Sequence, residues 1–166
     1  MITIKEIQSL QKQMTPKSGI VKRICKKYNI DLVDADVDID SVKMIEPVRR
    51  ITNRAFVYGD YRIVLGKFDC EEKKTAAFFH ELGHIFDNHS YKNKYEQEKY
   101  AWEWGMQYAK GCGFYPSKKT VQWCDDQLAT YTRHLSHSKE EKRLCPTCAT
   151  TDMYKHNRRM KKGYKI

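Results

Sequence analysis

The pattern of apolar and polar residues predicts two helices near the start of the chain. Over residues 3–14, apolar side chains recur every three or four positions until Pro16 interrupts the run. A second apolar stripe covers residues 20–28, with Ser18 before it as a capping residue and Asn29 near its end. Both stripes have the period of an amphipathic helix that packs one face against a core.

The next part of the chain has the shorter period of β-strands. Residues 30–40 alternate apolar side chains with aspartates, which predicts a short strand followed by an acidic loop. The runs RAFVY (54–58) and YRIVLGK (61–67) flank the dipeptide Gly59-Asp60, and this order predicts a β-hairpin. The second hairpin strand leads directly towards the most apolar of the predicted helices.

Three further helices are predicted in the second half of the chain. The first covers residues 71–87, and Asp69 with Glu72 is its capping signal. The second covers residues 95–111. Its inward positions are predicted to be Tyr95, Glu98, Ala101, Trp102, Gly105, Tyr108 and Ala109. The third covers residues 117–134. Its inward positions are predicted to be Val121, Cys124, Leu128 and Tyr131.

Size and charge narrow the class of protein. The chain has 166 residues, 40% of them hydrophobic, which suits one domain over residues 1–135 with a basic appendage over residues 136–166. Thirty-one lysines and arginines against 21 acidic residues give a net charge of +10. This charge should attract anionic partners such as nucleic acid or acidic protein. A surface that is only lysine-rich and soluble is the alternative, because the charge is spread along most of the chain.

The sequence contains no signal for secretion or for membrane insertion. The N-terminal stretch has no apolar core followed by a small-residue cleavage site, and no run approaches the length that a bilayer requires. We therefore expect a cytoplasmic protein without membrane contact, in which the six cysteines stay reduced. Reduced cysteines bind metals or pack in the core, and Cys25 on the second apolar stripe is expected to pack.

The motif HELGH at residues 80–84 carries the candidate chemistry. His80 and His84 lie four positions apart on a predicted helix, so their imidazoles point to one place, as two ligands of a zinc ion do. Glu81 lies one position away from His80 on the helix, where it can reach a water molecule but not easily the ion itself. This separation suits metal-assisted hydrolysis, in which the carboxylate takes a proton and passes it to the leaving amine.

Glu98 is the best candidate for a third ligand. It lies on the inward face of its predicted helix, where a carboxylate needs a positive partner such as a metal ion. Gly83 and Gly105 would let the two helices approach closely, with or without a metal. A surface or ion-paired glutamate is the alternative interpretation.

Other polar groups near the motif have less definite roles. His89 lies five positions after His84, off the ligand face, and is expected to be a loop histidine. A tyrosine could stabilise an oxyanion, but the pattern does not choose among four candidates. They are Tyr58, Tyr61, Tyr91 and Tyr131.

The motif and its surroundings resemble a known family. HELGH, preceded by a strand pair and followed after a loop by EKYAWEWG at residues 98–105, resembles the ImmA/IrrE family of zinc metallopeptidases over residues 18–133. The resemblance implies an α+β fold, a small zincin-like domain whose helices pack on a short mixed or antiparallel sheet, with a C-terminal helix and a basic tail. It implies zinc ligands at His80, His84 and Glu98, and Glu81 as general base. It also implies an edge strand, expected at residues 62–65, that pairs with an extended peptide.

The resemblance also implies a class of substrate. Members of the family often act on helix-turn-helix repressors in phages, mobile elements or stress-response systems. We therefore expect a zinc-dependent endopeptidase that cleaves an intracellular DNA-bound regulator or repressor, in the bacterial cytoplasm or, if phage-encoded, in that of the host. The main alternative is a non-catalytic zincin-fold protein that binds DNA or a regulatory protein. A third hypothesis is a phage-type protein that inhibits a host factor by contact alone.

Two positions depart from the family pattern. Tyr100 replaces a frequent second glutamate, and Trp102 stands where related zinc peptidases often carry an Asp or Asn that supports the site. A carboxylate that orients the histidines must then come from Asp87, Asp125 or Asp126. These departures bear on the rate of catalysis more than on metal binding.

The tail contains a second candidate zinc site. Cys145 and Cys148 form a CxxC pair, which His134 and His137, or else His156, could complete to four ligands. Free cysteines in a loose tail are the alternative. A SprT-like peptidase also joins HExxH to a C-terminal zinc ribbon, but the second CxxC of such a ribbon is missing from the sequence.

Basic residues gather at the end of the tail. Such a cluster can contact phosphates without reading sequence, and could bring a peptidase to DNA-bound substrates. The alternative is a solvated terminus. The residues concerned are Arg158, Arg159, Lys161, Lys162 and Lys165.

Overall fold

The computed structural model describes residues 19–45, 54–59, 61–87, 89, 91, 93–132 and 135. These residues form five helices and a three-stranded sheet, so the α+β class predicted from the resemblance is confirmed. The elements are α2 (Ile20–Tyr28), β1 (Asp31–Asp34), α3 (Ile39–Ile45), β2 (Ala55–Tyr58), β3 (Arg62–Leu65), α4 (Glu71–Phe86), α5 (Lys94–Gly111) and α6 (Lys118–Ala129). The predicted helix over residues 3–14 and the tail over residues 136–166 lie outside the described residues. None of the described helices is long and apolar enough to cross a membrane.

The sheet has the strand order β1-β3-β2, with β1 parallel and β2 antiparallel to β3. The predicted hairpin is therefore confirmed, and its turn contains Gly59 at a φ of 69°, where glycine is favoured. The prediction that residues 62–65 form the edge strand is wrong. β3 is the central strand because its apolar residues Ile63, Val64 and Leu65 are almost fully buried, and the outer strands among the described residues are β1 and β2.

A helix stands where an acidic loop was expected. After β1 the chain turns and forms α3, which begins at Ile39. The carboxylate of Asp38 accepts hydrogen bonds from the backbone N–H of Ser41, at 3.0 Å, and from its hydroxyl, as a helix-capping residue does. The alternation of aspartates with apolar residues concealed this capping signal. The aspartates before it have another partner, because the ammonium of Lys74 on α4 contacts Asp34 at 2.7 Å and Asp36 at 2.5 Å.

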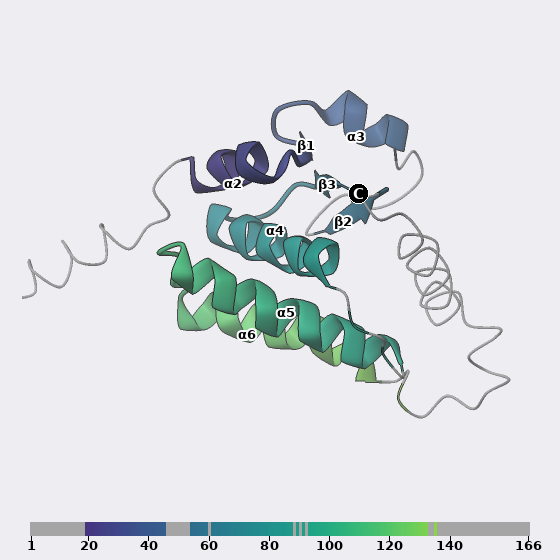
Figure 1. Cartoon of the computed structure of the whole chain (residues 1–166), viewed down its shortest axis with the longest axis vertical. Coiled ribbons are helices and arrows are strands. Elements are labelled where there is room, and N and C mark those ends of the chain that lie inside the picture. Colours follow the sequence, from purple (N-terminus) through teal and green to yellow (C-terminus); the bar gives the residue numbers. More distant parts are fainter. Residues whose placement is uncertain are drawn as a thin grey trace, which may run out of the picture.

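α4 is the central helix of the molecule. It lies between the sheet on one side and the pair α5 and α6 on the other (Figure 1). Its residues from Lys74 to Gly83 are all buried, and its Phe78, Phe79 and Leu82 belong to the main core. This position explains why a helix with polar groups in its middle is so apolar around them.

The capping signal predicted for α4 is wrong. The helix begins after Cys70, which makes no side-chain capping bond. Asp69 instead pairs with Lys73 at 2.7 Å, and Glu72 accepts hydrogen bonds from the backbone N–H of Ser117 at 2.9 Å and from its hydroxyl at 2.5 Å. A carboxylate expected to serve its own helix thus connects α4 to the start of α6.

α5 and α6 begin at polar caps, Asn93 and Ser117, whose side chains accept backbone N–H groups. The inward face predicted for α5 is largely confirmed. Its buried members are Glu98, Ala101, Trp102, Gly105 and Ala109. On α6 the predicted face is partly wrong, because Val121 is 45% exposed and Thr120 is buried in its place. Thr120 donates its hydroxyl to Glu72, so this residue faces α4.

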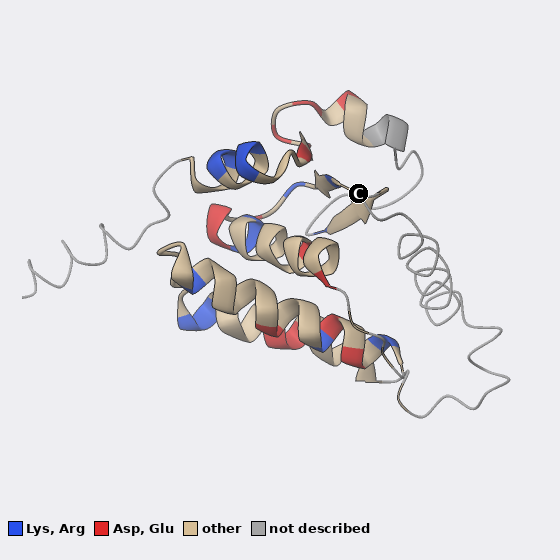
Figure 2. Cartoon of the chain, viewed as in Figure 1, with Lys and Arg blue, Asp and Glu red and all other residues tan. Residues whose placement is uncertain are grey.

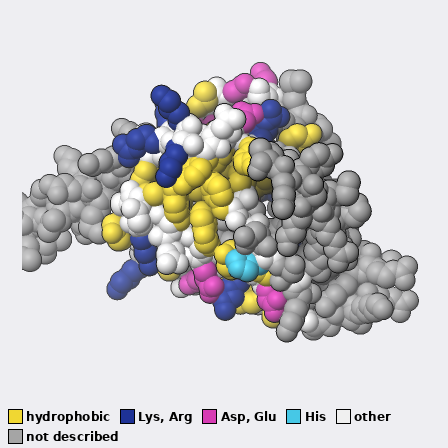
Figure 3. Space-filling view, viewed as in Figure 1, with side chains coloured by type: hydrophobic (Ala, Val, Ile, Leu, Met, Phe, Trp, Pro, Cys, Tyr) yellow, Lys and Arg dark blue, Asp and Glu magenta, His cyan; other side chains and the backbone are white. Residues whose placement is uncertain are grey.

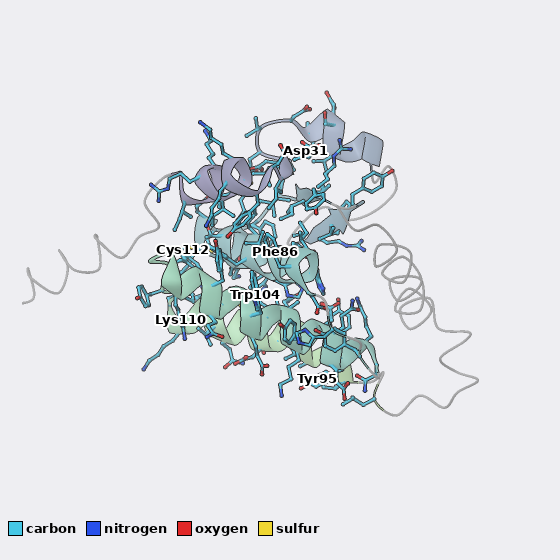
Figure 4. The ribbon with its side chains drawn as sticks, viewed as in Figure 1. Asp31, Phe86, Tyr95, Trp104, Lys110 and Cys112 are labelled. Carbon is cyan, nitrogen blue, oxygen red and sulfur yellow. The ribbon has the colours of Figure 1, made fainter. Side chains whose placement is uncertain are left out.

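One face of the molecule carries hydrophobic side chains in its middle, bordered by basic residues on one side (Figure 3). Aromatic rings of α2, α4 and α5 meet there. Phe86 lies 4.7 Å from Tyr28 and 5.6 Å from Trp104, measured between ring centroids. Figure 4 shows the Phe86 and Trp104 labels next to each other over α4 and α5. Phe86 of α4 thus packs against both α2 and α5.

Candidate metal centre

α4 supplies two of the candidate ligands. His80 and His84 lie one helical turn apart, and their Nε2 atoms are 3.2 Å from each other. The rings stand nearly perpendicular, with an interplanar angle of 80°. His80 is buried, with 7% of its surface exposed. The four-residue spacing therefore directs both imidazoles to one place, as the sequence predicted.

α5 brings Glu98 to the same place. Its Oε2 atom lies 3.0 Å from His80 Nε2 and 3.3 Å from His84 Nε2. The ligand atoms of the three residues all lie within 4.8 Å of one another, so the group could hold a metal ion. The structure thus brings together the three residues that the sequence predicted, from two helices joined by a loop.

The spacing and burial of the three side chains fit a metal ion. In a tetrahedral site with metal–ligand bonds of about 2.0–2.1 Å, neighbouring ligand atoms lie about 3.3 Å apart. The three separations here range from 3.0 to 3.3 Å. Polar groups with so little exposed surface need partners, and one metal ion would serve both imidazoles and the carboxylate.

The two imidazoles also determine the ionisation of Glu98. Burial opposes the charged form, but the charge of His84 and hydrogen bonds with both imidazoles hold the pKa of Glu98 well below its usual value. The carboxylate is therefore ionised at neutral pH, the state in which it can bind a cation.

Glu81 has a different environment. It is 6% exposed, and its Oε1 atom lies 3.9 Å from His80 Nε2, too far for a hydrogen bond. Burial outweighs the opposing charge of His80 and raises the pKa of Glu81 to about 7. A carboxyl group with such a pKa can both accept and release a proton near neutral pH.

Among the described residues, no carboxylate binds the Nδ1 atom of His80. Asp125 and Asp126 are exposed on α6, so the prediction that they support the buried histidines is wrong. Asp87 is buried, and its Oδ1 accepts the backbone N–H of His89 at 2.8 Å. Within the described part of the chain, His80 Nδ1 is buried and has no hydrogen-bond partner.

An aromatic ring takes the place of that carboxylate. Trp102, on α5, stacks on the imidazole of His80 with ring centroids 4.1 Å apart and an interplanar angle of 25°. Trp102 is a departure from the family pattern in the sequence, and the structure shows that its ring packs on the imidazole of His80 without binding Nδ1.

Lys94 is a site residue that the sequence analysis missed. Its Nζ atom lies 2.5 Å from Glu98 Oε1 and 3.1 Å from Gln97 Oε1. The available signal was the spacing of four between Lys94 and Glu98, which places both on one side of a helix. Such pairs are common on exposed helices, so the spacing alone did not indicate a buried contact.

The candidate ligands line a cavity of about 260 Å³. Its walls include Ala55, Phe56 and Val57 of β2, and Trp123 of α6. Among the four candidate tyrosines, Tyr131 lines this cavity, whereas Tyr58 and Tyr61 are 53% and 57% exposed on the hairpin. Tyr91 packs against Tyr100, with ring centroids 5.7 Å apart. Tyr131 is therefore the candidate tyrosine that adjoins the space for a ligand.

The remaining predicted site residues are not placed at this centre. His89 lies off the ligand face, as predicted, with its Nδ1 atom 3.2 Å from Asp87 Oδ1. The second candidate zinc site and the candidate nucleic-acid contacts lie outside the described residues. They are His134, His137, Cys145, Cys148, His156, Arg158, Arg159, Lys161, Lys162 and Lys165.

Comparison of the chain with protein families, with curated proteins and with solved structures found no match.

Proposed function

We propose that this protein is a zinc-dependent endopeptidase of the ImmA/IrrE type. The observation that carries the proposal is the convergence of His80, His84 and Glu98 beside the buried carboxyl group of Glu81. Two imidazoles and one carboxylate are a ligand set of catalytic zinc, which keeps a further position open for water or substrate. The cavity next to the three residues supplies room for both.

The protein residues divide the work of peptide hydrolysis. Zinc, when bound, would polarise the scissile carbonyl and make water a stronger nucleophile at neutral pH. Glu81 accepts the proton of the attacking water and passes it to the leaving amine. Tyr131 donates a hydrogen bond to the oxygen on which negative charge develops.

β2 is the element best suited to hold a peptide. Its residues Ala55, Phe56 and Val57 line the cavity, and it is an outer strand of the described sheet. An extended peptide that pairs with this edge would lie across the candidate metal centre. This geometry supports a protein substrate more than a small metabolite. A DNA-bound regulator is the substrate class that the family resemblance suggests.

A first experiment tests the metal centre directly. Zinc per chain is measured by elemental analysis in the wild-type protein and in the double variant His80→Ala, Glu98→Ala. We expect about one zinc per chain in the wild-type protein and none in the double variant, because the variant lacks two of the three candidate ligands. One zinc retained in the variant would assign the metal to the cysteine-containing tail. No zinc after incubation with excess zinc would refute the proposal.

A second candidate function rests on the charge of α2. Lys22, Arg23, Lys26 and Lys27 are exposed on this helix, which contains no acidic residue (Figure 2). A non-catalytic protein could use this surface to bind nucleic acid or an acidic protein. DNA binding that weakens with salt and survives loss of the zinc ligands would favour this function. Binding that is absent at low salt would exclude nucleic acid as the partner.

A further inference from the structure

The two oxygens of Glu98 have different neighbours. Oε2 lies 3.0 Å from the Nε2 atom of His80 and 3.3 Å from that of His84. Oε1 lies 2.5 Å from the ammonium of Lys94, which sits in the first turn of α5 next to Tyr95, labelled in Figure 4. One oxygen therefore belongs to the ligand cluster and the other to a cation.

The contact between Lys94 and Glu98 is enclosed. The side chains are only 12% and 4% exposed, respectively. Gln97 Oε1 accepts a second hydrogen bond from the same ammonium at 3.1 Å. A charge-assisted hydrogen bond with so little water around it is stronger than a surface ion pair and holds its geometry better.

A second pair on the same helix provides the contrast. Lys99 and Glu103 have the same spacing as Lys94 and Glu98, but their charged atoms are 3.6 Å apart and their side chains are 51% and 65% exposed. Such a pair contributes little and fixes no orientation. Spacing alone therefore does not explain the short distance between Lys94 and Glu98. This pair differs from the exposed one because both of its side chains are mostly buried at the wall of the cavity.

We propose that Lys94 is a positioning residue that occupies Oε1 of Glu98, so that this carboxylate offers a metal ion one oxygen only. The inference rests on the metal centre proposed above. A carboxylate that binds through both oxygens takes an additional coordination position, whereas a catalytic centre needs that position open. By donating to Oε1, Lys94 also draws electron density from the carboxylate and leaves the ion a stronger Lewis acid.

Cobalt(II) is the probe for this inference, because its visible absorption reports how many ligands surround it. The full-length protein is loaded with cobalt as wild type and as the variant Lys94→Met, which keeps the length of the side chain and removes its charge. We expect Lys94→Met to show a loss of visible molar absorptivity, as a fourfold site gains a second oxygen. Lys94→Arg, which restores a cationic donor, should recover the wild-type spectrum.

Lys99→Met is the matched control, since it removes a lysine with the same spacing from the same helix. Its spectrum should equal that of the wild-type protein. Lys94→Leu, which also lacks a donor, is measured in parallel, with circular dichroism of each variant, so that a misfolded methionine variant does not decide the outcome. Unchanged spectra in folded Lys94→Met or Lys94→Leu would overturn the role of Lys94 while leaving the metal centre intact. A wild-type protein that binds no cobalt would overturn the metal centre itself, and the role of Lys94 with it.

Discussion

Glu81 and Glu98 are buried carboxyl groups in one cavity, yet their surroundings shift their pKa values in opposite directions. Burial dominates at Glu81 and raises its pKa to about 7. At Glu98 the two imidazoles outweigh burial and lower the pKa. A pair of acidic groups whose environments push their pKa values apart is typical of sites that assign different tasks to each. Here Glu98 suits binding of a cation, and Glu81 suits transfer of a proton.

Replacing Glu81 by glutamine tests the proton-transfer role. The amide keeps the size of the side chain but cannot accept the proton, so we expect kcat on a cleaved protein substrate to fall by about 10²–10⁴-fold. Zinc content should stay as in the wild-type protein, because Glu81 lies outside the ligand group. Glu103→Gln, at an exposed position of α5, serves as the control. Equal cleavage by the wild-type protein and Glu81→Gln would rule out this residue as general base.

Trp102 gives a second prediction for a single residue. Its ring stacks on His80, whose Nδ1 atom has no hydrogen-bond partner among the described residues. Trp102→Ala should release the imidazole and weaken zinc affinity by roughly 10–100-fold, the usual effect of losing a group that orients a ligand. Trp102→Phe should retain most of the affinity, and Trp104→Ala all of it. Competition with a chromogenic zinc chelator measures each value.

α4 and α5 cross at two glycines, and this close crossing sets the distance between the ligands. A Cβ atom on Gly83 would lie 2.5 Å from the carbonyl oxygen of Ala101, and one on Gly105 would lie 2.3 Å from that of Phe79. Both obstacles are backbone atoms, which cannot move without shifting a helix. The glycines therefore permit Glu98 of one helix to reach His80 and His84 of the other.

Gly105→Ala is expected to separate the two helices. Overpacking of this kind costs about 1–3 kcal/mol of unfolding free energy, and the shift should also weaken metal binding. Gly111→Ala is the matched control, because Gly111 lies on the same helix and its Cβ would meet no atom within 4 Å. That variant should keep or slightly raise stability, since alanine is the better helix former. Urea denaturation of both proteins measures the difference, and equal midpoints would contradict the close-packing explanation.

The hydrogen bonds that connect α4 to α6 depend on the ionised carboxylate of Glu72. Burial opposes ionisation of Glu72, but hydrogen bonds from Ser117 and Thr120 outweigh it and lower its pKa. A carboxyl group whose pKa is lower in the folded state stabilises the fold above its unfolded pKa, and this contribution is lost as pH falls through the folded pKa. These hydrogen bonds between α4 and α6 should therefore stabilise the fold less as the pH falls.

Glu72→Gln makes this dependence measurable. At pH 7 the variant should be less stable than the wild-type protein by about 1.5–3 kcal/mol, the usual contribution of hydrogen bonds to a charged group. The difference should shrink as the pH is lowered below the ordinary pKa of glutamate. Thermal unfolding of both proteins from pH 7 to pH 3 tests this, and a constant difference across that range would show that the charge of Glu72 is not responsible.

In the molecule as a whole, the candidate centre joins two helices that meet only in the folded state. His80 and His84 come from α4 and Glu98 from α5, and the unfolded chain does not hold them together. A metal that binds the folded state alone stabilises it by mass action. Metal binding and folding are therefore expected to be linked.

Removal of the metal should lower the melting temperature of the protein. At a zinc concentration 100 times the Kd, the metal contributes about 2.7 kcal/mol, which for a chain of this size corresponds to roughly 5–10 °C. A strong chelator should cause this decrease and added zinc should reverse it. In the variant His80→Ala, Glu98→Ala, neither addition should change the melting temperature measured by differential scanning fluorimetry.

The sequence by itself determined the features that depend on local spacing. Helical periodicity located α2, α4 and α5, alternation located the hairpin, and the four-residue spacing of His80 and His84 predicted two candidate ligands on one helix face. Glu98 was also predictable, because a carboxylate on an inward helix face needs a cation. These inferences required only the geometry of a single helix or strand.

Only the tertiary structure decided which elements become neighbours. It made β3 the central strand and left β2 as the edge beside the cavity, against expectation. It turned Glu72 from a capping residue of α4 into a partner of α6, and it placed Trp102 on His80 and Lys94 on Glu98. Each of these contacts depends on how helices and strands pack together or on how deeply a pair is buried. Local spacing does not determine those properties, because burial changes the strength of an ion pair without changing its sequence pattern.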